Sequence, residues 1–216
     1  MTKAVDYTAF CRSAEEYLRS RAPEVAQEVV HAGFPAGRWH PYGFAVFKLA
    51  NAGELGTMRL HIWSAGKRIA WPNHPPVHEH EWHIAGLVLA GTYIDEEFDA
   101  SVGAGPDALP VVEIDSVEGR DVFRPTAQLL RLETDGRRAY RPGEIHFVRA
   151  GAYHASPIPE GTFAATLALT STPAQLRRSI AGLPVAGQRE YSRPLVSDED
   201  AARLRNEFSE HYRRDR

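Results

Sequence analysis

Apolar residues near the start of the chain recur at the three- and four-residue spacing of a helix, which places them on one stripe. They are Tyr7, Phe10, Cys11, Ala14, Tyr17 and Leu18. Pro23 suits a first helical turn, so a second short helix is expected to begin there and to end near Ala32. We expect both helices to pack against the outside of the main body; the alternative is a lid or a dimer arm.

From about residue 43 to residue 171 the pattern changes to short apolar segments separated by Gly, Pro, Asn and Asp. Many short strands without alternating helices predict an antiparallel sandwich or barrel. Thr134-Asp135-Gly136 predicts a hairpin turn, because Asp-Gly readily adopts positive φ angles. Glu96, Glu97 and Asp99 are expected in an acidic loop. The predicted strands are 43–49, 57–63, 87–90, 111–114, 128–133, 138–140, 144–148 and 163–170.

After residue 171 the pattern becomes helical again. Residues 174–181 are expected to form a short helix, and 184–194 an irregular stretch. The sequence from Ser197 to Asp200 resembles a capping box and predicts a final helix with an apolar side that includes Leu204 and Phe208. We therefore expect one all-β domain, with a helical extension at 1–42, a barrel at 43–171 and a C-terminal extension at 172–216.

Length, charge and cysteine content exclude several classes of protein. The 216 residues are enough for one domain with a substantial core. A formal charge of −3 gives no basic footprint, so nucleic acid is not an expected partner. The single Cys11 excludes an internal disulfide and a Cys-rich zinc site. Without a signal-like N-terminus or an apolar run long enough to span a membrane, a cytoplasmic protein with no membrane association is expected.

Histidines are concentrated in one short segment. Four of the ten, His74, His78, His80 and His83, lie within 73–91, whose sequence is NHPPVHEHEWHIAGLVLAG. In an extended strand, side chains two residues apart point the same way, so His78 and His80 would direct two imidazoles into one space. Imidazole suits zinc, iron, copper and nickel. In a small antiparallel barrel, inward-facing positions converge, so a distant histidine can complete such a pair.

A second segment, 141–154, supplies that histidine and a resemblance. Its sequence RPGEIHFVRAGAYH places Gly143, Gly151 and His154 at the spacing of the second cupin motif, G-x5-P-x-G-x2-H, with Arg149 in place of the proline. His78, His80 and Gly91 follow the first cupin motif, G-x5-H-x-H-x(3,4)-E-x6-G, without its leading glycine. In this order and about sixty residues apart, the two segments resemble the cupin superfamily over residues 43–170.

The resemblance implies a small antiparallel barrel of jelly-roll type with a mononuclear metal held by His78, His80 and His154. Ile84, or Ala85 with the longer spacing, stands where the cupin motif has a glutamate ligand. A three-histidine site of this kind resembles that of the thiol dioxygenase branch, which uses ferrous iron. The Ser-x-His-x-Tyr relay of that branch is absent from 164–172, AATLALTST, so a thiol substrate is not implied.

Further residues are candidates for binding and catalysis. Arg59 and His61 share one face of the strand 57–63 and are predicted to hold an anionic substrate group, if that face lines a cavity and not solvent. His83 is a candidate for a supporting role if a turn or bulge brings it to the face of His80. His146, directed inward or outward, and Trp82 are the other candidates. His31, His40 and His211 are expected at the surface, and His74 in an exposed loop.

The leading functional prediction is a non-haem oxidoreductase of the cupin superfamily, an Fe(II) dioxygenase or oxygenase. Its partners would be dioxygen and a small polar metabolite, one that bears a carboxylate. One alternative is a non-redox isomerase, lyase or hydrolase that uses Zn, Mn or Ni. Another is a cupin that binds a small molecule without catalysis. A terminal helix could also serve as a homodimer contact.

Overall fold

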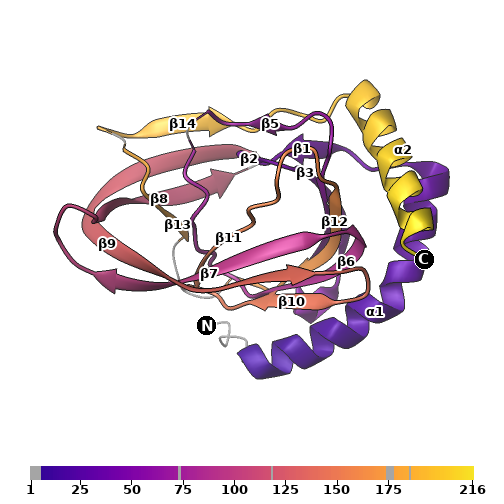
Figure 1. Cartoon of the computed structure of the whole chain (residues 1–216), viewed down its shortest axis with the longest axis horizontal. Helices are drawn as coiled ribbons and strands as arrows, with labels where there is room; N and C mark the ends of the chain where they lie inside the picture. Colours follow the sequence, from indigo (N-terminus) through magenta and orange to yellow (C-terminus); the bar gives the residue numbers. More distant parts are fainter. Residues whose placement is uncertain (1–5, 73, 118, 174–177, 185) are drawn as a thin grey trace.

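A computed structural model describes residues 6–72, 74–117, 119–173, 178–184 and 186–216. These residues form two helices and mostly antiparallel strands, in two larger sheets and one two-stranded sheet (Figure 1). None of their helices is long and apolar enough to cross a membrane. The chain is therefore mostly β, with helices near both ends, as the sequence predicts.

The first sheet has the strand order β1-β3-β4-β12-β6-β10 in the described part of the chain. Its strands are β1 (Gly37–Trp39), β3 (Ala45–Asn51), β4 (Thr57–Trp63), β6 (Ile84–Gly91), β10 (Ile145–Val148) and β12 (Ala164–Thr170). Neighbouring strands are antiparallel throughout. Because β12 lies at the centre and both of its faces are covered, all of its residues are buried.

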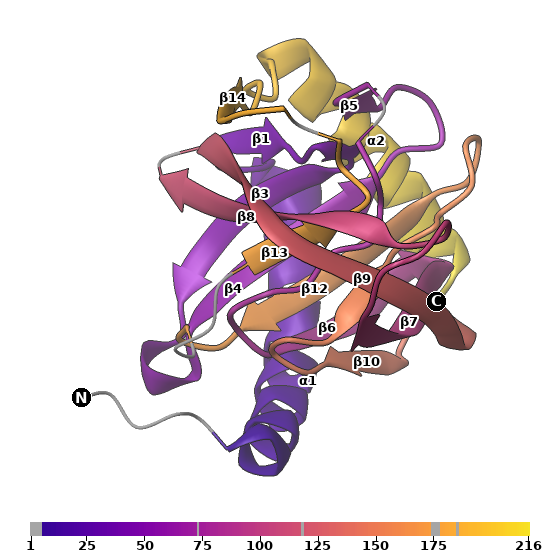
Figure 2. The same cartoon turned by 90° about the vertical axis from the view of Figure 1, so that its left-hand side faces the viewer.

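The second sheet has the order β11-β7-β9-β8-β13, and β14 also pairs with β9. Its strands are β7 (Tyr93–Val102), β8 (Leu109–Val117), β9 (Arg120–Tyr140), β11 (Tyr153–Ala155), β13 (Arg178–Ala181) and β14 (Arg189–Ser192). The short strands β2 (Tyr42–Gly43) and β5 (Ile69–Ala70) pair separately, and a 3₁₀ turn, η1 (Gly53–Leu55), follows β3. Figure 2 shows β8 and β9 crossing in front of β4, β12 and β6, so the two sheets face each other.

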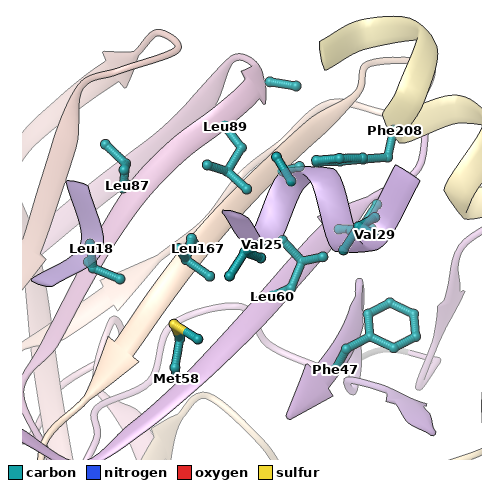
Figure 3. Close-up of a cluster of buried hydrophobic side chains, with 14 of the residues drawn as sticks. Leu18, Val25, Val29, Phe47, Met58, Leu60, Leu87, Leu89, Leu167 and Phe208 are labelled. Atoms are coloured by element: carbon teal, nitrogen blue, oxygen red, sulfur yellow. The ribbon is translucent and has the colours of Figure 1, made fainter. Parts of the chain in front are cut away.

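Both helices cover the face of the first sheet that points away from the second sheet. They are α1 (Tyr7–Ala32) and α2 (Asp198–Arg214), and both contact β6. The core between helices and sheet contains Leu18, Leu60, Leu167 and Phe208, each fully buried (Figure 3). Alternation along the strands then directs the other set of side chains toward the second sheet, where the candidate site lies.

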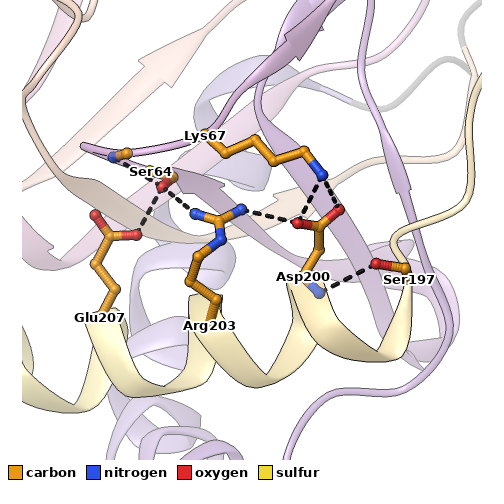
Figure 4. A network of polar contacts seen from close by, with 7 residues as sticks. Ser64, Lys67, Ser197, Asp200, Arg203 and Glu207 are labelled. Atoms are coloured by element: carbon orange, nitrogen blue, oxygen red, sulfur yellow. Dashed lines mark hydrogen bonds and ion pairs between the residues drawn. The ribbon is translucent and has the colours of Figure 1, made fainter.

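Helix α2 begins at the predicted cap and is fastened by charged contacts. The Ser197 hydroxyl accepts a hydrogen bond from the Asp200 amide at 3.1 Å. The Asp200 carboxylate pairs with Lys67 at 2.9 Å and with Arg203 at 3.1 Å (Figure 4). Glu207 accepts a 2.7 Å hydrogen bond from the Ser64 hydroxyl. These contacts hold the helix to the segment that follows β4 and keep the outer face of the sheet covered.

The prediction of two helices before residue 33 is wrong, because α1 continues through Pro23. Asp6 caps its first turn by accepting a 2.8 Å hydrogen bond from the Ala9 amide. An internal proline removes one backbone hydrogen bond and crowds the preceding turn. Here Leu18 before the proline and Val25 after it are both buried in the same core, which offsets that loss.

The predicted hairpin at Asp135-Gly136 is also wrong. These residues lie within β9, which pairs with β7 from Tyr93 opposite Tyr140 to Val102 opposite Leu130. The register steps from Glu97 opposite Gly136 to Phe98 opposite Thr134, so Asp135 is the extra residue of a β-bulge. The expected acidic loop at 96–99 is likewise part of β7, where Glu96 lies directly opposite Arg137.

The region after β12 differs from prediction as well. Of the expected helix at 174–181, residues 174–177 lie outside the described part of the chain, and 178–181 form the strand β13, not a helix. This strand pairs with β8, with Ser179 opposite Glu113. In the stretch expected to be irregular, 184–194, residues 189–192 form β14 against β9. Non-local pairing with the long second sheet decides the conformation of both segments.

Candidate metal centre

Three histidines from two distant segments meet between the sheets. His78 and His80 lie between β5 and β6, and His154 lies in β11. His78 and His154 form an isolated antiparallel bridge, with N–H···O distances of 3.0 and 2.9 Å between their backbones. Gly151 adopts a positive φ of 79° and donates its amide to the His80 carbonyl at 2.9 Å. This glycine turn therefore brings the second motif alongside the first.

The side chains of these residues have the separations that a shared ion requires. One ring nitrogen from each histidine can be chosen so that all three lie within 4.8 Å of one another. The ring centroid of His78 is 4.6 Å from the His80 centroid and 4.6 Å from the His154 centroid. The His80 and His154 centroids are 5.3 Å apart. Three imidazoles converge on one point, and this is the only such group of metal-ligating side chains among the residues described.

The hydrogen bonds of the three rings fit a metal site. Nδ1 of His78 lies 2.8 Å from the Pro76 carbonyl, and Nδ1 of His154 lies 3.1 Å from the Asp95 carboxylate. Donation from Nδ1 leaves the Nε2 lone pair of each ring available. Nε2 of His154 and Nδ1 of His80 are buried and have no hydrogen-bond partner within the described residues. Buried polar atoms without partners are unfavourable, and a bound metal would satisfy them.

Burial also favours the neutral form of the imidazoles, which is the form that binds metal. It is the main reason why the pKa values of His78 and His80 lie well below the ordinary histidine value. The next contribution to His78 comes from His154, and the next contribution to His80 comes from His78. His78 and His80 are therefore neutral nitrogen donors, and the cavity beside them leaves room for further ligands.

Asp95 is part of this site and was not found from the sequence. It is 3% exposed and receives hydrogen bonds from His154 at 3.1 Å and from the Tyr93 hydroxyl at 3.3 Å. Burial alone would raise its pKa, but the hydrogen bond and charge of His154 hold the pKa below its ordinary value. The alternation of Tyr93 and Asp95 along a strand indicates this inward direction, but the acidic residues at 96–99 favour a loop in the sequence.

Replacing Asp95 with asparagine is expected to weaken metal binding about 10- to 100-fold. The carboxylate orients the His154 ring and favours the tautomer that leaves Nε2 free for a metal, and a neutral amide does both to a lesser degree. The affinity can be measured by competition with a chelator of known strength. Asp99→Asn, an exposed position on the same strand, is the matched control. Equal affinities for the two variants would contradict the assigned role of Asp95.

A cavity of about 550 Å³ opens beside the three histidines. Its wall includes Arg59, His61 and Trp63 from β4, so this face of the strand lines the cavity and does not face solvent. Trp82 stacks on His80 with a ring separation of 5.5 Å. Volumes of 300–1,000 Å³ are typical of sites for small organic molecules. The cavity therefore accommodates a metabolite next to the metal position.

Charge in the cavity is only partly balanced. Arg193 makes two hydrogen bonds with Asp121, at 2.8 and 3.0 Å, and Arg178 pairs with Glu81 at 3.2 Å. Arg59 has no carboxylate partner in the described part of the chain, and its guanidinium lies 5.3 Å from the centre of the Trp82 ring. Burial, and then Arg193 and Arg178, lower its pKa to about 10, so it stays charged at neutral pH. An enclosed cation without a counter-charge is suited to binding an anion.

Two further predicted histidines also line the cavity. Burial lowers the pKa of His146 to about 4; burial, and then Arg59, lower that of His61 to about 3. Both rings are therefore neutral at physiological pH. His146 stacks on Tyr93 with centroids 4.1 Å apart. His146 therefore points inward, which the sequence left open, and His61 shares the cavity with it.

His83 does not join the site. Its ring lies 5.1 Å from that of Tyr7 and 5.6 Å from that of Phe10, so it packs against α1. Its Nδ1 accepts a 2.9 Å hydrogen bond from the Ala150 amide. Because His83 is an odd number of residues from His80, its ring points to the helix side of the sheet. This position does not indicate a supporting role at the metal.

Two other histidines were expected at the surface and instead line the cavity. His40 stacks on Phe44 with a ring separation of 4.3 Å, and burial holds its pKa well below the ordinary value. His74 is half-buried and contacts Trp71 and Tyr42 through its ring. Neither lies in a segment with an alternating pattern, so the sequence had no signal for their direction.

Comparisons with protein families and curated proteins identify no relative of this chain. No protein-family model matches the chain, and no significant match to a curated protein is found.

Proposed function

We propose that this protein is a mononuclear metal-dependent oxygenase with a cupin-type barrel, that its metal is ferrous iron, and that it acts on a small carboxylate-bearing metabolite. Support for the barrel comes from the two facing antiparallel sheets and from the order and spacing of the two histidine segments. The observation that carries the proposal is the convergence of His78, His80 and His154 at a cavity that also holds the unpaired Arg59.

The residues around the cavity would have separate roles in metal binding and substrate binding. His78, His80 and His154 would hold the metal, and Asp95 would orient the His154 ring. When bound, ferrous iron supplies open coordination positions and the electrons that activate dioxygen. Arg59 would bind the substrate carboxylate through two parallel hydrogen bonds.

Trp82 separates this anion position from the metal ligands, since it stacks on His80 and lies under Arg59. The neutral rings of His61 and His146 can each donate one hydrogen bond and accept another beside the substrate. A dioxygenase reaction transfers both oxygen atoms to the substrate, so no external reductant is required.

A non-redox reaction is the second candidate, because the same three-histidine ligand set also suits zinc. Three neutral imidazoles with an open position are also a known catalytic arrangement for zinc, which lowers the pKa of a bound water and polarises carbonyl groups. The same Arg59 would then bind the substrate of an isomerase, lyase or hydrolase. The two candidates differ in their need for oxygen.

Metal analysis followed by oxygen uptake tests the proposal. Protein purified without a His-tag is expected to contain close to one metal ion per chain. Samples reconstituted anaerobically with Fe(II) or Zn(II) are then mixed with oxygenated buffer and a panel of small carboxylates. The Fe(II) form should consume oxygen in proportion to one of the carboxylates, and the Zn(II) form should consume none. Turnover by the Zn(II) form without oxygen would support the non-redox candidate, and failure to bind any metal would contradict both.

A further inference from the structure

The inner face of the first sheet carries a row of residues that runs across four strands. The antiparallel register places Arg59 (β4) beside Ala168 (β12), Ala168 beside Gly86 (β6), and Gly86 beside His146 (β10). Three inter-strand steps of about 4.8 Å separate the backbones of the two end residues by about 14 Å. A long cationic side chain and an imidazole thus stand at opposite ends of a stretch that contains only small residues.

The two small residues are buried, and neither is among the residues that line the cavity. Ala168 is 1% exposed and has only a methyl group. A Cβ placed on Gly86 would lie 2.0 Å from Cε1 of His146, so the His146 ring lies directly over the Gly86 backbone. Because the ring occupies this position, it points along the row and not away from it. We call the part of the cavity wall that lies between Arg59 and His146 the cavity floor.

The neighbouring row contributes a polar group without a partner. Thr166 lies beside His61 on the cavity side of β12. Its hydroxyl is buried, with the residue only 1% exposed, and has no hydrogen-bond partner among the described residues. His146 is 4% exposed, and its Nδ1 is likewise buried without a hydrogen-bond partner among the described residues. Two buried polar atoms that border one cavity and lack partners indicate where a ligand atom would be bound.

From these observations, and on the basis of the proposed function, we propose that the substrate is held at two points on the cavity floor. Its carboxylate binds Arg59, and a second hydrogen-bonding group at its other end, a hydroxyl or a carbonyl, binds the Thr166 hydroxyl and the His146 imidazole. The substrate class is therefore a small hydroxy- or oxo-carboxylate. Thr166 is a specificity-determining residue, because it supplies the second binding point.

Binding of matched acids tests the proposal on the zinc-loaded protein, which holds the metal without redox turnover. The probes are 4-hydroxybutyrate with butyrate, and 5-hydroxypentanoate with pentanoate, titrated by calorimetry. At least one hydroxy acid is expected to bind about 3- to 10-fold more tightly than its parent acid, the gain of one to two hydrogen bonds. Equal binding of both members in both pairs, or no binding of any probe, would overturn the proposal.

Substitutions at the floor locate the effect. Thr166→Val keeps the shape of the side chain and removes the hydroxyl, so it should abolish the preference for the hydroxy acid. Thr166→Ser should retain the preference. Retention of the preference in Thr166→Val would contradict the second binding point.

Metal content separates this proposal from the one on which it rests. None of these variants changes a histidine of the metal group, so each should retain close to one zinc ion per chain. Normal metal content without a hydroxy-acid preference overturns the cavity-floor proposal alone. A wild-type protein that binds no metal overturns the proposed function and this inference with it. If Thr166→Val does not fold, the comparison of the paired acids on the wild-type protein still decides the outcome.

Discussion

Replacing His154 with alanine is expected to abolish metal binding. His154 is 4% exposed, bridges to His78 through its backbone, and supplies the one ligand that comes from the second histidine segment. Loss of an outer-shell partner already weakens a metal site about 10- to 100-fold, so loss of a direct ligand should weaken it by more than about 100-fold. The metal content should fall from close to one ion per chain to a trace.

The metal content is measured by elemental analysis after dialysis, and the fold is checked by circular dichroism. His74→Gln is the matched control, because His74 lines the same cavity and is not one of the three converging histidines. It should retain the metal. The alanine variant also leaves the Asp95 carboxylate buried without its imidazole partner, so a lower melting temperature is expected for it. Full metal content in His154→Ala would exclude the assigned ligand set.

Replacing Arg59 with methionine is expected to have two effects of opposite sign. Binding of the substrate carboxylate should weaken by about 30- to 1,000-fold, which corresponds to about 2–4 kcal/mol for a lost charge-assisted pair. The ligand-free protein should become more stable, because a largely buried cation without a carboxylate partner among the described residues is replaced by an apolar chain. A residue that served only the fold would not separate the two measurements in this way.

Lys48→Met is the matched control for this prediction. Lys48 lies directly opposite Arg59 on the neighbouring strand and also borders the cavity, but its side chain is exposed. The substitution should change neither the melting temperature nor the affinity for carboxylates by a comparable amount. Affinity is measured by titration of the zinc-loaded protein with carboxylates, and stability by thermal unfolding without ligand. A less stable Arg59→Met protein that binds carboxylates normally would show that Arg59 is a structural residue.

Local pattern predicted much of the secondary structure, and its failures have a common cause. The strand at 57–63 and the final helix starting beside Ser197 were both predicted, because alternation and capping are local properties. The helix break at Pro23 and the hairpin at Asp135-Gly136 were predicted from local preference and are absent. In each case the chain continues because long-range contacts outweigh a local cost: the helix packs on the sheet, and β9 pairs with β7.

The sequence by itself determined which residues could act together at the candidate centre. The two-residue spacing of His78 and His80 and the glycine-histidine spacing that ends at His154 are properties of the chain alone. It also determined that Arg59 and His61 share one side of a strand, because successive side chains alternate.

Only the tertiary structure decided which side faces the cavity, since alternation groups side chains without giving their direction. Helices α1 and α2 cover the face of Leu60 and Leu167, so the opposite face, with Arg59 and Thr166, is enclosed by the second sheet. The same packing buries Asp95 against His154 and leaves the Arg59 charge without a carboxylate in the described part of the chain. Burial, counter-charge and partner identity depend on residues far apart in the sequence, and only the folded chain brings them together.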